Sequence, residues 1–284
     1  MKAYRGKFSP GSLALNCFGG LTLLFLSGPL IVVGIMSFSA GSGLEFPPPG
    51  WSMQWYEQLF ASAQWSSAVK NSLLVGGVSS VVALVLGGLA AYGLARATFK
   101  GRGAIFAFFL APLIIPPIVT AVALFLIFTR YGLRNSILGI TIGHVVIITP
   151  YVVLLLVVAF QSFDGKLELM ARSLGATWFT SFRIVVLPML IPSLLAAWLI
   201  AIVVSFDEVI VTIFVAGSQP TVPKLMFSQL RDRIDPTVSA LSTILVLVTI
   251  LAMLVAWVVM KSSQNSRKAV AGVMAGQAAT KEIG

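Results

Sequence analysis

Charged residues are scarce in this sequence. They make up 10% of its 284 residues, and only nine of them are acidic. A soluble domain carries roughly 25% charged residues to cover its surface, so most of this chain's surface must face lipid or other apolar protein. The only cysteine, Cys17, lies inside an apolar run, which excludes a disulfide framework. No phosphate-binding loop, metal-binding cluster or nucleophile–base pair is visible in the sequence, so we expect neither an enzyme nor a cofactor of its own.

Long apolar runs are abundant, and six of them are long enough to cross a bilayer, which takes roughly 20 residues. Backbone groups in lipid must pair within their own segment, so each run is expected to be helical. The sequence therefore predicts an all-α membrane domain over residues 13–260, with terminal segments at 1–12 and 261–284. The expected spans are Leu13–Phe38, Val69–Leu94, Ala104–Thr129, Ile137–Phe160, Ile184–Phe206 and Ser239–Met260. The first span is too long for a signal peptide, so we expect it to be retained.

The basic residues predict the orientation of these spans. With the N-terminus inside, thirteen of the 19 Lys and Arg residues fall on the inner side and six on the outer side. Because cytoplasmic loops carry the excess of Lys and Arg, both termini and the loop at 164–183 are expected to be cytoplasmic. The outer six are Lys70, Arg130, Arg134, Lys224, Arg231 and Arg233.

The loop at 164–183 contains an expected amphipathic helix. Asp164 is placed to cap that helix, because its charge suits a helix N-terminus. Gly175 supplies a turn that a larger residue would obstruct. Between them, four residues at helical spacing form an apolar stripe: Leu167, Met170, Ala171 and Leu174.

A second short helix is expected to follow in the same loop. Thr177 is placed to cap it, and Trp178 and Phe179 lie on it. Aromatic side chains in a charged loop need a protein partner or the lipid surface to cover them. The spacing of Gly175 to the later Leu187-Pro188 pair favours a protein partner.

Residues 167–176 and 185–188 together resemble the EAA loop of permease subunits in bacterial ABC importers. The resemblance implies a type I importer permease fold with six transmembrane helices, in which this loop is a coupling helix that docks on a separate ATPase. ATP and Mg²⁺ would then bind in that ATPase. The coupling residues it implies are Glu168, Leu169, Met170, Ala171, Leu174, Gly175, Ala176, Trp178 and Phe179. The family has a Glu where Leu169 stands, so either Glu168 serves instead or the contact with the ATPase is weaker.

Several further stretches resemble the second permease subunit, the C type, of spermidine/putrescine importers. They are 205–211, 214–217, 223–227 and 234–237, and the likeness covers about residues 13–260. The resemblance implies a bacterial inner-membrane importer for a polyamine, with a paralogous permease, two ATPase subunits and an external binding protein as partners. Importers for aminobutyrate, opines or aminoethylphosphonate look similar and stay open as alternatives. A proton-coupled secondary carrier is the rival from another class.

Two adjacent carboxylates, Asp207 and Glu208, lie late in an apolar stretch from Ile184 to Ala216. Charges at membrane depth are costly and are tolerated where they face water or a partner. For a cationic substrate they would replace lost hydration, so we place them in the substrate pathway with Phe206 and Tyr151. A contact to a basic residue of the partner permease, or the outer headgroup zone, would explain them equally well. We expect the helix to break near Gly217 and Pro220.

His144, in the fourth span, is the only histidine. It is either a hydrogen-bonded structural residue or, in a carrier, a proton relay. Prolines including Pro116 and Pro117 are expected to kink the third span.

The outer loop between the first two spans contains a second amphipathic segment. Ser52 is placed as its N-cap, and the aromatic and apolar residues that follow recur at helical spacing. Aromatic rings favour the headgroup level of a bilayer, so a short helix is expected at the outer interface. It would either anchor the chain or contact a binding protein. The spaced residues are Trp55, Tyr56, Leu59 and Phe60.

Overall fold

The computed structural model describes residues 10–232, 235–251 and 254. These residues are helical apart from the connecting loops and one isolated bridge between Ser39 and Trp51. The chain divides into two compact units, one made of residues 1–61 and 234–284, the other of residues 62–233.

The first unit contains α1 (Pro10–Met36), α2 (Gln54–Ala61) and a helix at Thr237–Leu251. The first expected span is confirmed as α1. The sixth expected span is helical as far as Leu251, and its predicted end at Met260 lies outside the described residues, as do most of the two terminal segments. The expected helix in the outer loop is confirmed as α2, whose second residue, Trp55, donates its indole N–H to the Ser39 carbonyl at 2.7 Å.

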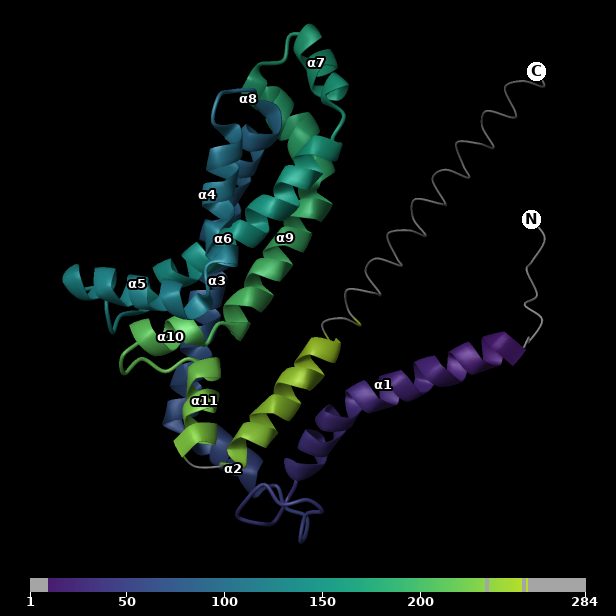
Figure 1. Ribbon diagram of the computed structural model, residues 1–284, viewed down its shortest axis with the longest axis vertical. Coiled ribbons are helices and arrows are strands. Elements are labelled where there is room, and N and C mark those ends of the chain that lie inside the picture. The colour runs from purple at the N-terminus through teal and green to yellow at the C-terminus, as the bar shows by residue number, and fades with distance from the viewer. Residues whose placement is uncertain (1–9, 233–234, 252–253, 255–284) are drawn as a thin grey trace. The chain divides into compact units, whose positions relative to one another are not determined.

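The second unit is built around three long helices that pack against one another (Figure 1): α3 (Ala63–Arg96), α6 (Ile137–Ser162) and α9 (Leu187–Asp207). Small residues bring α3 and α6 together, since a Cβ on Gly87 would lie 2.9 Å from Val152. The buried core between the three helices includes Ala83, Ala91, Ile148, Val152, Leu156, Ala197 and Ala201.

The fifth expected span begins earlier than predicted. A helical run extends from Trp178 to Asp207 without interruption. It consists of α8 (Trp178–Ser181), a π-helical turn at Phe182–Val186, and α9. In the π-helical turn the Leu187 amide bonds the carbonyl of Phe182, five residues earlier. This wider turn lets the helix continue into Pro188, which has no N–H to donate.

The third expected span is not one kinked helix. It consists of α4 (Arg102–Ile114) and α5 (Pro117–Arg130), which meet at an angle of 101°. Pro116 and Pro117 donate no backbone hydrogen bond, and a residue before a proline is driven out of the helical region. Ile115 accordingly has an extended ψ of 132°. The described residues therefore contain four helices long enough to cross a membrane, and five if this bent pair is counted as one span.

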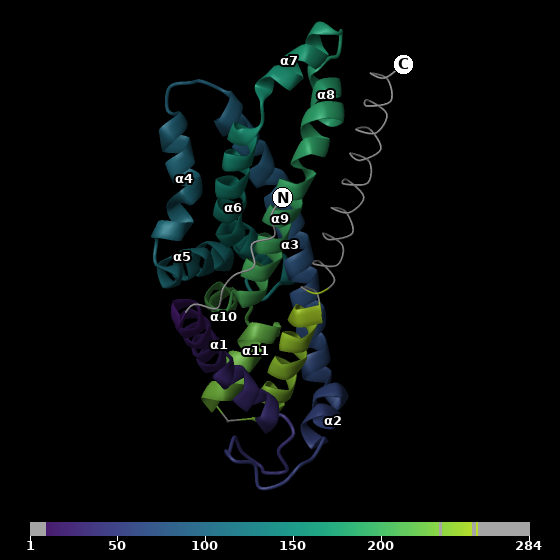
Figure 2. The same cartoon turned by 90° about the vertical axis from the view of Figure 1, so that its right-hand side faces the viewer.

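The loop helices of the second unit lie at opposite ends of the α3–α6–α9 bundle. Both views place α7 (Gly165–Ser173) and α8 at one end, and α10 (Ile210–Val215) and α11 (Val222–Asp232) at the other (Figures 1 and 2).

Neighbouring side chains of α3 fix the loop before α11. The Asn71 amide donates to the Pro220 carbonyl at 2.8 Å, and the Ser72 hydroxyl accepts from the Val222 amide at 2.8 Å. These two hydrogen bonds attach the α11 end of the bundle to α3.

Candidate functional site

Helix α7 has well-formed caps at both ends, as the sequence predicts. The Asp164 carboxylate accepts a hydrogen bond from the Lys166 amide at 3.0 Å. At the other end, Gly175 adopts a φ of +93°. The Ala176 amide bonds the Ala171 carbonyl, and the Gly175 amide bonds the Arg172 carbonyl. This double pattern is the Schellman motif, which requires the left-handed conformation that glycine adopts readily.

The exposed face of α7 differs from the predicted stripe. The most exposed apolar side chains are Leu169, Met170 and Leu174, at 61%, 62% and 90%. Leu167 is only 36% exposed, and Ala171 is half-buried. Lys166, Leu169, Met170, Ser173 and Leu174 together line a shallow cavity of about 430 Å³ on the helix surface. Leu169, the position where the resembled family has Glu, therefore belongs to the outward apolar face.

Helix α8 is attached to the bundle through aromatic rings. Thr177 caps it as expected, accepting from the Thr180 amide at 3.2 Å. The Trp178 indole donates to the Tyr92 hydroxyl at 3.1 Å and stacks on Phe182. Phe179 stays 65% exposed. The structure therefore assigns Trp178 partly to anchoring the loop on α3, and leaves Phe179 free for a partner.

A basic residue that the sequence analysis missed supports the start of α7. The Arg96 guanidinium lies 5.1 Å from the ring centre of Phe163. One of its terminal nitrogens would lie 2.8 Å from a Cβ on Gly165. Arg96 ends α3, so its position directly after an apolar run was the available signal in the sequence. Together with Tyr92, one turn earlier, it joins the end of α3 to the loop.

The expected helix break near Gly217 is found, since α10 ends at Val215 and Gly217 has a φ of +55°. A second break, which the sequence did not predict, lies at the carboxylates. Helix α9 ends at Asp207, Glu208 is extended with a ψ of 105°, and α10 starts two residues later. Phe206 packs on α3, where a Cβ on Gly76 would lie 3.1 Å from its ring. Asp207 is exposed, and its carboxylate has no hydrogen bond or ion pair among the described residues.

Glu208 has a different environment from its neighbour. It is half-buried, and its carboxylate accepts a hydrogen bond from the Val211 amide at 2.7 Å. A carboxylate at this place accepts from an N–H group that has no partner within α10, and its negative charge is stabilised by the positive end of the helix dipole. Tyr151 is not brought to this site, because it lies on α6 about 10 Å along the axis beyond His144.

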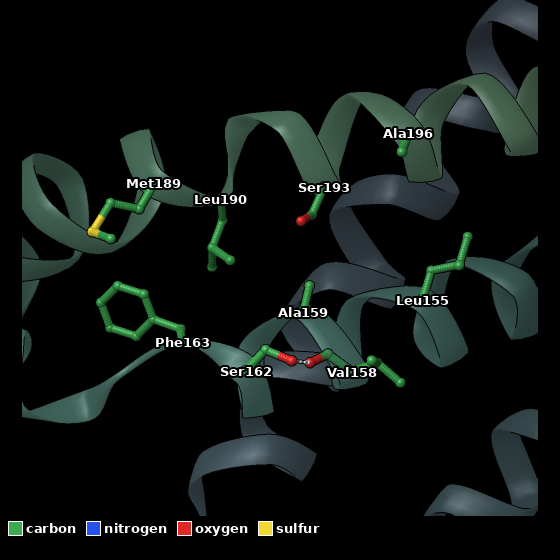
Figure 3. A pocket seen from close by; sticks show the side chains of 9 residues that line it. All are labelled: Leu155, Val158, Ala159, Ser162, Phe163, Met189, Leu190, Ser193 and Ala196. Atoms are coloured by element: carbon green, nitrogen blue, oxygen red, sulfur yellow. Dashed lines mark hydrogen bonds between the residues drawn. The ribbon is translucent and has the colours of Figure 1, made fainter. Parts of the chain in front are cut away.

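The cleft between α6 and α9 is an apolar feature (Figure 3). Its volume is about 490 Å³. The polar side chains that line it are Ser162 and Ser193, and the Ser162 hydroxyl already donates to the Val158 carbonyl at 2.9 Å. A cleft without a carboxylate offers nothing to replace the hydration of a cation. The remaining lining residues are Leu155, Val158, Ala159, Phe163, Met189, Leu190 and Ala196.

The described residues therefore form a multi-pass helical bundle with an exposed apolar helix in one of its loops. The chain belongs to the family described as binding-protein-dependent transport system inner membrane component, whose pattern matches residues 83–266. It is 32% identical to the putrescine transport system permease protein PotI of Escherichia coli K12, over 87% of this chain and 90% of that protein. It is 30% identical to the spermidine/putrescine permease protein PotC of Haemophilus influenzae, over 83% and 91%.

A solved structure gives the same fold. The crystal structure of a bacterial ABC transporter that imports alginate matches with a TM-score of 0.69 at 17% identity, covering 90% of this chain and 99% of that one. The chain is thus an all-α multi-pass membrane permease of a binding-protein-dependent ABC importer. It is a transport subunit rather than an enzyme. Its membership of this family excludes the alternative hypothesis of a proton-coupled secondary carrier.

Proposed function

We propose that this chain forms one half of the translocation pathway of an ATP-driven importer for a small amine cation. A paralogous permease would form the other half, two ATPase subunits would bind ATP and Mg²⁺, and an external binding protein would deliver the substrate. The whole complex would lie in a bacterial inner membrane. ATP-driven closure of the ATPases would move the coupling loops and expose the pathway alternately to each side.

The exposed apolar face of α7 is the observation that carries the coupling role. Leu169, Met170 and Leu174 are covered by nothing else in the described chain, and burying a Leu is worth roughly 1.5–3 kcal/mol. The caps of α7 and the contacts of Trp178 with Tyr92 and Phe182 hold this loop against the bundle. A displacement of α7 would therefore move α9, which continues from α8. We assign ATPase contact to Glu168, Leu169, Met170, Ala171, Leu174, Gly175, Ala176, Trp178 and Phe179.

The orientation of the permease follows from the same loop. Docking on an ATPase requires α7 at the cytoplasmic side, and the opposite placement of α10 and α11 then faces them outward (Figure 1). This agrees with the distribution of basic residues, which favours a cytoplasmic N-terminus and C-terminus.

A polyamine is the substrate class we favour. The named relatives are permeases for putrescine and spermidine. In this chain, Asp207 offers an exposed carboxylate beside a helix break, where it is available to an ammonium group. Phe206 would contribute to the wall of the path beside Asp207, and Tyr151 to a part of the path further along α6. Glu208 would hold the helix break that presents Asp207, through its hydrogen bond at the start of α10.

The test is uptake of radiolabelled putrescine and spermidine by the four-part complex in proteoliposomes, with ATP enclosed and binding protein outside. We expect uptake that depends on ATP and on the binding protein. Uptake of aminobutyrate, an opine or aminoethylphosphonate in place of the polyamines would assign the alternative substrates. Failure of the chain to co-purify with any ATPase would contradict the importer assembly.

A further inference from the structure

His144 connects three helices through its imidazole ring. It lies on α6 and is only 3% exposed. Its Nδ1 is 2.8 Å from the Ser205 hydroxyl on α9, and its Nε2 is 2.9 Å from the Thr212 hydroxyl on α10. Buried polar groups are expected to have partners, and here both ring nitrogens have one. These two partners lie on either side of the break at Glu208.

The directions of these hydrogen bonds follow from the number of protons available. A hydroxyl has one proton to donate. The Thr212 hydroxyl donates to the Glu208 carbonyl at 3.0 Å, so it accepts from His144, and Nε2 must carry the ring proton. In the neutral ring Nδ1 is then an acceptor, so the Ser205 hydroxyl donates to it. The Ser79 hydroxyl of α3 lies 3.3 Å from Ser205 and is also placed to donate to the Gly76 carbonyl of its own helix, at 3.5 Å.

The hydrogen bonds therefore form one directed series, from Ser205 of α9 through His144 and Thr212 to the carbonyl of Glu208. Glycines let the helices approach closely around it, since a Cβ on Gly143 would lie 2.9 Å from Val211 of α10. A carbonyl at membrane depth needs an internal partner, and the Thr212 hydroxyl is that partner for the Glu208 carbonyl. The Val211 amide, three residues after Glu208, donates to the Glu208 carboxylate.

We propose that His144 is a positioning residue of the substrate pathway. As a neutral imidazole protonated at Nε2, it fixes the break so that Glu208 caps α10 and Asp207 projects outward. A second proton on the ring would remove the acceptor that Ser205 needs, so the ring serves as a fixed bridge and not as a proton relay. The inference rests on the proposed function, because Asp207 is taken as part of the pathway.

The tautomer is directly measurable because His144 is the only histidine in the chain. The full-length chain, purified through a tag without histidine and carrying ¹⁵N-labelled histidine, gives imidazole signals from this residue alone. We expect a protonated Nε2 and an unprotonated Nδ1 at neutral pH. The opposite tautomer, or an imidazolium with both nitrogens protonated, would overturn the proposal. This measurement does not depend on what the importer carries.

Substitution at Thr212 tests the positioning role. Thr212→Val keeps the shape but removes the hydroxyl, so it leaves both the His144 N–H and the Glu208 carbonyl without this partner. We expect putrescine uptake by the assembled complex to fall about tenfold or more, since a lost buried partner is costly. Amide hydrogen exchange over residues 207–215 should rise. Thr212→Ser retains the hydroxyl and should restore both readouts.

Thr141→Val is the matched control, because Thr141 is a buried threonine on α6, the helix of His144, whose hydroxyl donates to the Ile137 carbonyl of its own helix. It should leave both uptake and exchange at the wild-type level. Equal exchange and uptake in Thr212→Val and wild type would overturn the proposal, as would loss of assembly in that variant. If the wild-type complex takes up no amine at all, the proposed function fails, while the tautomer and the exchange experiment still decide the role of His144.

Discussion

The Glu208 carboxylate accepts a hydrogen bond from the Val211 amide at 2.7 Å, whereas the adjacent Asp207 carboxylate is exposed and has no partner within the part of the chain that the structure describes. The two acids therefore have different environments, and we infer different roles for them, although they are neighbours in the sequence. One holds the start of α10 and the other is available to a substrate or a partner.

Asp207→Asn should lower polyamine uptake by about tenfold or more, because it removes a charge that would pair with an ammonium group. Glu208→Gln should change uptake far less, because the amide oxygen of Gln still accepts from the Val211 amide. The measurement is uptake by complexes of matched assembly yield. An equal loss of uptake in the two variants would contradict this difference in roles.

The combined variant, Asp207→Asn with Glu208→Gln, separates the pathway role from a contact with the partner permease. In the partner case, neutralising the acids leaves a buried basic residue unpaired, which costs about 3–5 kcal/mol and should prevent assembly. In the pathway case, assembly is normal and uptake is lost. Normal assembly with normal uptake would place both acids in the outer headgroup zone.

The sequence predicted the structure of the loop helix, α7, better than the structure around the proposed substrate pathway at Asp207 and Glu208. Asp164, Thr177 and Gly175 act within a few residues of themselves, so their local chemistry determines the caps and the turn. Met170 and Leu174 of the predicted stripe are on the outward face of α7, whereas Leu167 and Ala171 are less exposed and Leu169 is exposed in their place. Spacing predicts a stripe, but the packing of the rest of the protein decides which side chains it covers. Leu169 belongs to the exposed face for that reason.

Long-range contacts explain what the sequence could not show. The bond between Asn71 and Pro220 joins residues 149 apart, and no local pattern indicates it. The break at Glu208 was not predicted, because the hydrogen bonds beside it include one between Thr212 of α10 and His144 of α6, which lie far apart in the sequence. The right-angle bend at Pro116 was visible as two prolines, but its size depends on α5 packing against α10.

Gly175→Asp should sharply reduce uptake while the membrane domain stays folded. Asp and Asn both tolerate the left-handed conformation at this position better than other side chains, so Gly175→Asn is a control of the same shape without the charge. We expect Asn to retain most of the activity and Asp to lose it, together with ATPase association. Wild-type uptake and full ATPase association in Gly175→Asp would contradict the coupling assignment.

Leu174→Ser should weaken ATPase binding by about tenfold or more without destabilising the permease. The side chain is 90% exposed, so its free energy of burial is realised only in the complex. The measurement is the dissociation constant for the purified ATPase, beside the thermal midpoint of the permease. Ser66→Ala, at an exposed position near the start of α3 and away from α7, should leave both values unchanged. A lower midpoint for Leu174→Ser would instead show that this side chain stabilises the permease itself.

Cysteine labelling tests the orientation in a background where Cys17, the only native cysteine, is replaced by Ser. A cysteine at Ser173 should react only from the cytoplasmic side, and one at Ser42 only from outside. Both positions are exposed, so a membrane-impermeant maleimide should reach each from its own side. The reverse pattern would place α7 outside the cell, away from ATP, and would remove the basis for docking on an ATPase.

Ser72→Ala should destabilise the end of the bundle where α11 lies. The Ser72 hydroxyl accepts from the Val222 amide, which is buried, and an amide left without this partner costs about 1–3 kcal/mol. We expect a lower thermal midpoint in detergent and faster amide exchange at the start of α11. Ser66→Ala is the matched control, since Ser66 lies on the same helix but is exposed. Because the affected bond is far from α7, ATPase association should stay at the wild-type level in both variants. A loss of association in Ser72→Ala would mean that the two ends of the bundle are coupled.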